Sequence, residues 1–101
     1  MTIAPGIVLP EAEIAAICVR YQVQELAIFG SAARGELRPE SDVDLLVEFK
    51  PAARPGLLGL AALSRELSTL LGRRVDLAVR PALKPRVRPI VLAEALLIYA
   101  A

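Results

Sequence analysis

Two aspartates, Asp42 and Asp44, are separated by one residue at the start of a segment that reads as a β-strand. Side chains of a strand alternate between its faces, so both carboxylates point to the same side, with their backbones roughly 7 Å apart. Gly30 and Ser31, which ten residues separate from Asp42, follow another strand-like segment. A glycine lets a phosphate approach the backbone, and a helix that begins at such a turn offers free amide donors. The pattern predicts a divalent cation beside a phosphate-binding turn.

A third aspartate, Asp76, lies in a later strand-like segment, and the chain has only these three Asp against eight Glu. Aspartate is disfavoured in strands, so each placement indicates a functional role. If the strands are neighbours, about 4.8 Å apart, the three carboxylates converge. An all-oxygen ligand set favours Mg²⁺, with Mn²⁺ as the other candidate, and predicts nucleotidyl or phosphoryl transfer with two metal ions. Arg34 offers a forked donor to a triphosphate.

Composition excludes several other classes of site. The chain has 101 residues, 55% of them hydrophobic and 23% charged, which indicates one ordered domain over residues 1–101. It has no histidine, so a zinc site or a histidine-based triad is excluded, and its single cysteine, Cys18, is expected to be a buried core thiol. The net charge of +1 predicts no direct nucleic-acid partner. Without a membrane-spanning run or signal peptide, we expect a soluble cytoplasmic protein.

Two other phosphate or metal motifs fail on inspection. Gly30 and Gly35 have the spacing of a P-loop, but Glu36 and Leu37 stand where Lys and Ser or Thr are required. The segment from Asp42 onward lacks the third oxygen ligand and the turn glycine of an EF-hand loop. P-loop ATPase chemistry and an EF-hand calcium site are therefore rejected.

Hydrophobic periodicity and turn residues predict the elements that must position these side chains. The expected order is an irregular stretch over 1–9 with a turn at Pro5 and Gly6, a helix over about 10–21, a strand over 24–29, a short helix capped by Ser31 that runs through Arg34, a strand over 43–49, a helix over 57–71 ending at Gly72, a strand over 73–79, and a terminal segment over 90–101 that is mostly helical with a candidate strand at 96–99.

The central motif resembles a known superfamily. Gly30-Ser31, ten residues and then Asp42-Val43-Asp44 match the Gly-Ser-x10-Asp-x-Asp signature of the polymerase-beta-like nucleotidyltransferases. The fuller strings Gly-Ser-Ala-Ala-Arg-Gly-Glu, Ser-Asp-Val-Asp-Leu-Leu-Val-Glu-Phe and Arg-Arg-Val-Asp-Leu-Ala-Val are similar to the MNT-type minimal nucleotidyltransferases. The resemblance covers roughly residues 10–99.

This resemblance implies an α/β (α+β) domain of the polymerase-beta-like nucleotidyltransferase fold, with a small mixed sheet, helices mainly on one face and the acidic site on the other. It further implies that Gly30 and Ser31 hold the nucleotide phosphates, that Asp42 and Asp44 bind the metal ions, and that Asp76 is the third carboxylate, which helps to activate the attacking hydroxyl. Arg34 matches the family's Ala-Arg-Gly-Glu element.

The family also implies a partner. Many such proteins are antitoxins paired with a HEPN-domain ribonuclease, and some transfer AMP from ATP to a tyrosine of that toxin. The chain has no residues left for a second domain that would hold an acceptor, so a partner protein is expected, in a hetero-oligomer, or else a homodimer. The alternative from another class is an antitoxin that neutralises its partner by occlusion, without catalysis. Ordinary alternatives also stay open for single residues: Ser31 as a simple helix cap, Arg34 as a surface arginine, and Asp76 as a partner of Arg74.

Overall fold

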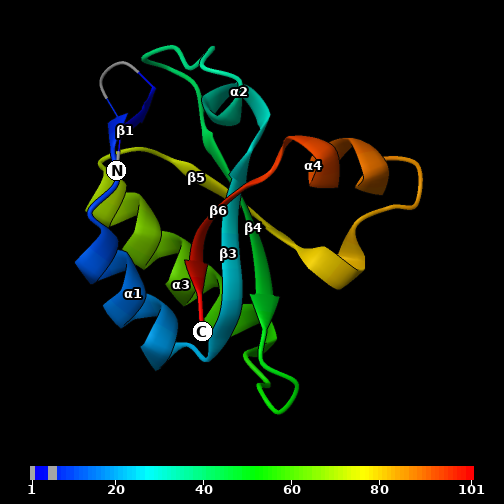
Figure 1. Ribbon diagram of the computed structural model, residues 1–101. Helices are drawn as coiled ribbons and strands as arrows, with labels where there is room; N and C mark the ends of the chain where they lie inside the picture. The colour runs from blue at the N-terminus through cyan, green and yellow to red at the C-terminus, as the bar shows by residue number, and fades with distance from the viewer. Residues whose placement is uncertain (1, 5–6) are drawn as a thin grey trace.

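The computed structural model describes residues 2–4 and 7–101, with side chains from residue 8 onward. Its centre is a four-stranded mixed sheet in the order β5-β4-β3-β6, with two helices against one face (Figure 1). The elements, in chain order, are β1 (Thr2–Ala4), β2 (Ile7–Val8), α1 (Glu11–Arg20), β3 (Val23–Phe29), α2 (Gly30–Ala33), β4 (Val43–Phe49), α3 (Gly56–Leu71), β5 (Val75–Val79), the 3-10 helix η1 (Arg80–Ala82), α4 (Arg88–Glu94) and β6 (Leu96–Ala100).

The strand register brings together the residues that the sequence singled out. Strand β3 runs antiparallel to β4 and β6, and Phe29 at its end pairs with Asp44. Strands β4 and β5 are parallel, and Asp44 pairs with Asp76. The end of β3, where the chain turns into α2, therefore lies at the same end of the sheet as the carboxylates of β4 and β5.

Helices α1 and α3 cover one face of the sheet (Figure 1). Pro10 precedes α1, and two glutamates in its first turn lie near the positive end of the helix dipole. Helix α3 ends at Gly72, whose φ of 66° is the left-handed conformation that glycine adopts at little cost. The main core lies between these helices and the sheet and includes Ile14, Ile17, Cys18, Val23, Leu26, Ile28, Val43, Leu45, Val47, Leu63, Leu67 and Val75.

Two serines of α3 hold β5 in place. The Ser68 hydroxyl accepts a hydrogen bond from the backbone amide of Val75 at 3.1 Å, and the Ser64 hydroxyl donates to the Val75 carbonyl at 3.5 Å. These contacts fix the residue that immediately precedes Asp76. The hydroxyls of α3 thus contribute to the position of a carboxylate on the far side of the sheet.

The other face of the sheet is only partly covered. Val91 of α4 packs against Ala27 and Leu46 in a second, smaller cluster. Helix α4 therefore shields the middle of this face and leaves the end that carries the aspartates accessible. The predicted fold class, a small mixed sheet with helices mainly on one face, is confirmed.

The structure corrects two details of the sequence interpretation and confirms a third. Residues 1–9, expected to be irregular, contain the antiparallel pair β1 and β2; the predicted turn at Pro5 and Gly6 lies outside the described residues. Ser31 does not cap α2, because the helix already begins at Gly30 and Phe29 holds the N-cap position. In the terminal segment the candidate strand is confirmed as β6, and helix α4 is short.

Within residues 2–4 and 7–101, no helix is long and apolar enough to cross a membrane. That the whole chain is a single domain stays a prediction.

Candidate active site

Asp44 and Asp76 are neighbours on adjacent parallel strands. As paired residues they point to the same face, about 4.8 Å apart at the backbone. Asp42 lies just before β4, and its Oδ1 atom is 3.9 Å from Nε of Arg74. The Arg74 side chain is 83% exposed, so this contact with Asp42 is a weak one in solvent. Arg74 thus lies toward Asp42, whereas the sequence had left it as a candidate partner for Asp76.

Gly30 lies directly against Asp44. Its φ of +71° is in the left-handed region, and a Cβ atom on Gly30 would lie 2.2 Å from Oδ2 of Asp44. Only glycine satisfies both the conformation and the close approach. The turn that is expected to hold phosphates and the carboxylate that is expected to hold a metal are therefore in contact.

The electrostatic environment of Asp44 is strongly acidic. Burial raises the pKa of the Asp44 carboxyl, and the neighbouring charges of Asp76, Asp42 and Glu94 raise it further, while Arg34 opposes them. An ionised Asp44 is therefore held among like charges. A divalent cation would relieve this repulsion, and a carboxylate-only donor set suits Mg²⁺ or Mn²⁺.

The Arg34 side chain contacts two carboxylates. Its Nη1 atom is 3.0 Å from Oε2 of Glu94, and its Nε atom donates to Oε1 of Glu36 at 2.8 Å. Oε1 of Glu94 accepts a hydrogen bond from the Gly30 amide at 2.9 Å. Glu94 therefore links Arg34 to the Gly30 turn, and a role of Arg34 in nucleotide binding stays a prediction.

Sequence reasoning missed Glu94. One feature of the sequence could have singled it out: Glu94 is the only charged residue in the apolar segment from 90 to 101. The predicted role of Ser31 in phosphate binding stays a prediction. Ser31 is half-buried within α2, and its carbonyl accepts from the Glu36 amide at 2.8 Å, which closes the turn.

Comparison with known proteins decides the family, because residues 12–98 match the nucleotidyltransferase domain. The chain belongs to this family. A relative from Thermococcus cleftensis, the protein adenylyltransferase MntA, is 44% identical over 75 residues, which are 74% of each chain. The predicted resemblance to minimal nucleotidyltransferases and the predicted enzyme class are thereby confirmed.

Solved structures agree with this nucleotidyltransferase fold. One, assigned provisionally as a minimal nucleotidyltransferase, is 42% identical, covers 85% of this chain and 86% of its own, and has a TM-score of 0.73. A toxin–antitoxin crystal structure with AMP-PNP has a TM-score of 0.75 over 92% of this chain and 75% of its own. At 21% identity, that second likeness establishes the fold alone.

The metal-binding roles of this nucleotidyltransferase stay predictions. Among the described residues, no three or more His, Cys, Asp or Glu side chains are arranged as a group that could hold a metal ion. The reason lies in the positions already given: Asp42 precedes the strand and lies toward Arg74, and Asp76 is exposed. The three carboxylates share one end of the sheet without forming a closed set of ligands.

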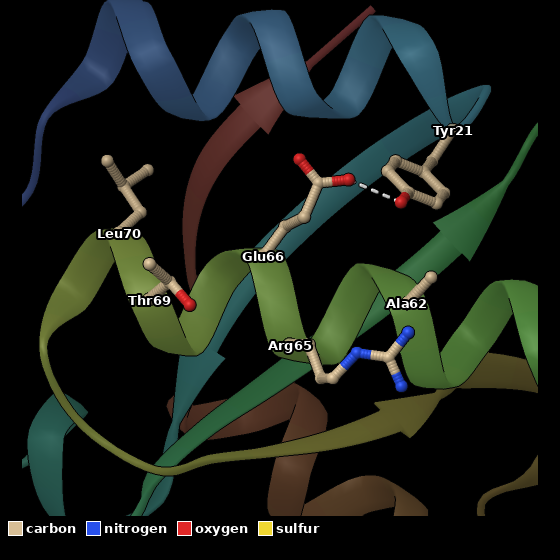
Figure 2. Close-up of a pocket in the computed structure, with 6 residues that line it drawn as sticks. All are labelled: Tyr21, Ala62, Arg65, Glu66, Thr69 and Leu70. Atoms are coloured by element: carbon tan, nitrogen blue, oxygen red, sulfur yellow. Dashed lines mark hydrogen bonds between the residues drawn. The ribbon is translucent and has the colours of Figure 1, made fainter.

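The nucleotidyltransferase also has a hollow of about 530 Å³ elsewhere, against α1 and α3 (Figure 2). Its lining residues are Tyr21, Ala62, Arg65, Glu66, Thr69 and Leu70. The Tyr21 hydroxyl donates a hydrogen bond to Glu66 (Figure 2). Glu66 also accepts from Nη2 of Arg20 at 2.7 Å. Because the aspartates point away from the helical face, this hollow is not part of the candidate active site.

Proposed function

We propose that this nucleotidyltransferase transfers AMP from ATP to a hydroxyl of a partner protein, a tyrosine of a HEPN-type ribonuclease toxin, and thereby acts as that toxin's antitoxin in the cytoplasm. The Thermococcus cleftensis relative named protein adenylyltransferase MntA supports the transfer of AMP to a protein. Solved complexes of MntA with HepT, and a toxin–antitoxin complex with AMP-PNP, share the fold and are consistent with the choice of partner and nucleotide.

One observation carries the proposal: the Gly30 turn, Asp44 and Asp76 meet at one exposed end of the sheet. A nucleotidyltransferase must hold a triphosphate beside carboxylates. Among the site residues predicted from the sequence, these are the ones that strand pairing and close approach bring together. Gly30, Ser31 and Arg34 are assigned to the phosphates. Asp42, Asp44 and Asp76 are assigned to the metal and the chemistry.

The reaction follows from these assignments. The acceptor hydroxyl oxygen attacks the α-phosphorus of ATP, and a bond forms between them. The bond from that phosphorus to the oxygen bridging to the β-phosphate breaks, and pyrophosphate leaves. The hydroxyl proton passes to a carboxylate, for which Asp76 is the candidate, since it is exposed and lies next to Asp44 on the parallel strand.

Asp42, Asp44 and Asp76 would hold Mg²⁺, with Mn²⁺ as a substitute. The bound ion would supply positive charge that neutralises the triphosphate and stabilises the departing pyrophosphate. The acidic surroundings that raise the pKa of Asp44 support this assignment, because they favour a nearby cation. In this assignment the carboxylates act on the triphosphate through the metal ion, whereas Arg34 and the Gly30 turn would contact the phosphates directly.

The test is a transfer assay with the full chain, its genomic neighbour, Mg²⁺ and ATP labelled on the α-phosphate. We expect label on the neighbour and none when a double variant, Asp42→Asn with Asp44→Asn, replaces the wild type. Full transfer by the folded double variant would overturn the assignment of the site. A tight complex in which the wild type leaves the neighbour unlabelled would instead favour neutralisation by occlusion.

A further inference from the structure

We infer that Glu94 is a positioning residue for nucleotide binding: its carboxylate holds the two ends of α2 together and so sets the geometry of the phosphate-binding turn. The inference rests on the proposed function, because it assigns Gly30 and Arg34 to the triphosphate. It adds a residue from the C-terminal part of the chain, outside the Gly-Ser and Asp-x-Asp motifs.

Helix α2 needs an external support. It has only four residues, Gly30–Ala33, and so short a helix is unstable alone. Its first amides require acceptors, yet Phe29 at the N-cap has no polar side-chain atom to provide one. Gly30 also holds a left-handed φ of +71°. A group outside the helix must therefore fix this turn.

Glu94 supplies that support from a distant segment. One carboxylate oxygen accepts from the amide of Gly30, the first residue of α2, at 2.9 Å. The other is 3.0 Å from Nη1 of Arg34, the C-cap residue of the same helix. A single carboxylate thus bridges both ends of α2 and orients the backbone turn and the guanidinium together. Both contacts are charge-assisted hydrogen bonds, which are stronger than neutral ones.

Glu94 is itself well fixed. It is the last residue of α4, which Val91 anchors in the smaller apolar cluster on the sheet. The following strand β6 begins at Leu96, which pairs with Ile28 of β3. The Glu94 side chain is 24% exposed, against 46% for Arg34. Glu94 is therefore the more buried member of the pair, and the more exposed Arg34 is the group that it orients.

The contacts also argue against Glu94 as a further metal ligand. Both of its oxygens already accept hydrogen bonds, one from a backbone amide and one from a guanidinium. Arg34 keeps a second carboxylate partner, Glu36, at 2.8 Å. Glu36 is the natural control, since its carboxylate also pairs with Arg34, whereas the Gly30 amide donates to Glu94. The Glu36 side chain is 62% exposed.

The experiment compares Glu94→Ala, Glu94→Gln and Glu36→Gln with the wild type. The first readout is the Kd for a non-hydrolysable ATP analogue with Mg²⁺, measured by calorimetry without any acceptor. We expect Glu94→Ala to weaken binding at least roughly tenfold, the equivalent of one charge-assisted hydrogen bond. Glu94→Gln keeps an acceptor for Gly30 and should lose less, and Glu36→Gln should stay within about twofold of wild type.

Two further readouts separate positioning from a general loss of structure. In transfer assays, Glu94→Gln should raise the KM for ATP more than it lowers kcat. In ¹H–¹⁵N spectra, the Gly30 amide signal should shift in both Glu94 variants while signals from α1 and α3 stay in place. If Glu94→Ala fails to fold, Glu94→Gln decides on its own.

The outcomes distinguish this inference from the proposed function. Nucleotide binding in the Glu94 variants that equals or exceeds that of wild type would overturn the positioning role, even if the wild type transfers AMP normally. A wild type that transfers no AMP, together with analogue binding that depends on Glu94, would overturn the proposed function and leave the positioning role intact. A wild type that does not bind the analogue would overturn both.

Discussion

Glu66 and Glu94 make similar contacts on opposite faces of the sheet. Each carboxylate accepts from an arginine and from a second donor far away in the sequence: Arg20 and Tyr21 for Glu66, Arg34 and Gly30 for Glu94. The difference lies in the second donor. Tyr21 is a side chain, so Glu66 joins two helices, whereas the Gly30 amide is backbone, so Glu94 constrains the conformation of a turn. The same chemistry therefore serves packing on one face and a binding geometry on the other.

The two faces also differ in their electrostatics. Hydrogen bonds from Arg20 and Tyr21 hold the pKa of Glu66 below its ordinary value, so its charge stabilises the folded chain. Burial and neighbouring acids raise the pKa of Asp44, so its charge opposes folding. A site that concentrates negative charge for a cation gives up some stability in the absence of that cation.

Asp44→Asn should separate activity from stability most sharply. We expect transfer to fall by roughly a hundredfold or more, because a group aimed at the reacting centre is lost. The variant should be more stable than wild type in EDTA. Because the pKa of Asp44 is raised in the folded chain, its carboxyl favours folding when protonated at acid pH, and this contribution is lost as the pH rises and the group ionises. Asparagine does not ionise, so the variant avoids this loss. The advantage of the variant should therefore grow between acid and neutral pH.

Thermal midpoints of Asp44→Asn and wild type, measured against pH in EDTA, check this expectation. Glu40→Gln is the control, because Glu40 is an exposed acid in the loop between α2 and β4. A variant less stable than wild type at neutral pH would contradict the proposed conflict between Asp44 and its acidic neighbours.

Gly30→Ala should damage both activity and stability. The new Cβ would lie 2.2 Å from Oδ2 of Asp44, in a left-handed conformation, and we expect a loss of about 2 kcal/mol or more in the free energy of unfolding. Gly35→Ala is a matched control, because Gly35 has a similar φ of +73° but open space around it. It should cost only about 1–2 kcal/mol of backbone strain and leave transfer largely intact. Urea unfolding and the transfer assay provide both measurements, and equal losses of activity in the two variants would contradict the role of the Gly30–Asp44 contact.

The sequence predicted the parts of this molecule that local patterns encode. The alternation in β4 and the helical spacing in α3 located these elements, and the one-residue spacing of Asp42 and Asp44 located the acids. The pairing of Asp76 with Asp44 depends on strand order, which the sequence supported only through the family resemblance. The contacts of Glu94 could not be predicted, because its partners lie 60 and 64 residues away, and its isolation in an apolar segment was the one local signal. Strands β1 and β2 are too short, at three and two residues, to give a periodic signal.

Glu66→Gln should change how the stability of the fold depends on pH and leave the transfer activity unchanged. Because its pKa is lowered in the folded chain, Glu66 contributes stability above the ordinary glutamate value of 4.5, and this contribution is lost as the pH falls below it. The variant should therefore be less stable than wild type near neutral pH and approach it at acid pH. Thermal midpoints from pH 3 to 7 test this, and a change in the KM for ATP would contradict the separation of the two faces.

Labelling of Cys18 should give the finest contrast between the faces. This thiol is fully buried in α1, and burial raises its pKa to about 11, so at pH 8 it should react with a disulfide reagent only when the helical layer opens. Glu66→Gln removes a link between α1 and α3 and should speed labelling roughly twofold to fivefold, the range expected for an exposed ionic contact. Glu94→Gln acts on the other face and should leave the labelling rate unchanged, with full reaction of all forms in guanidinium as the reference. Equal acceleration by both variants would mean that the two faces open together, and Glu94 would then be part of the general stability of the fold rather than a support for the phosphate-binding turn.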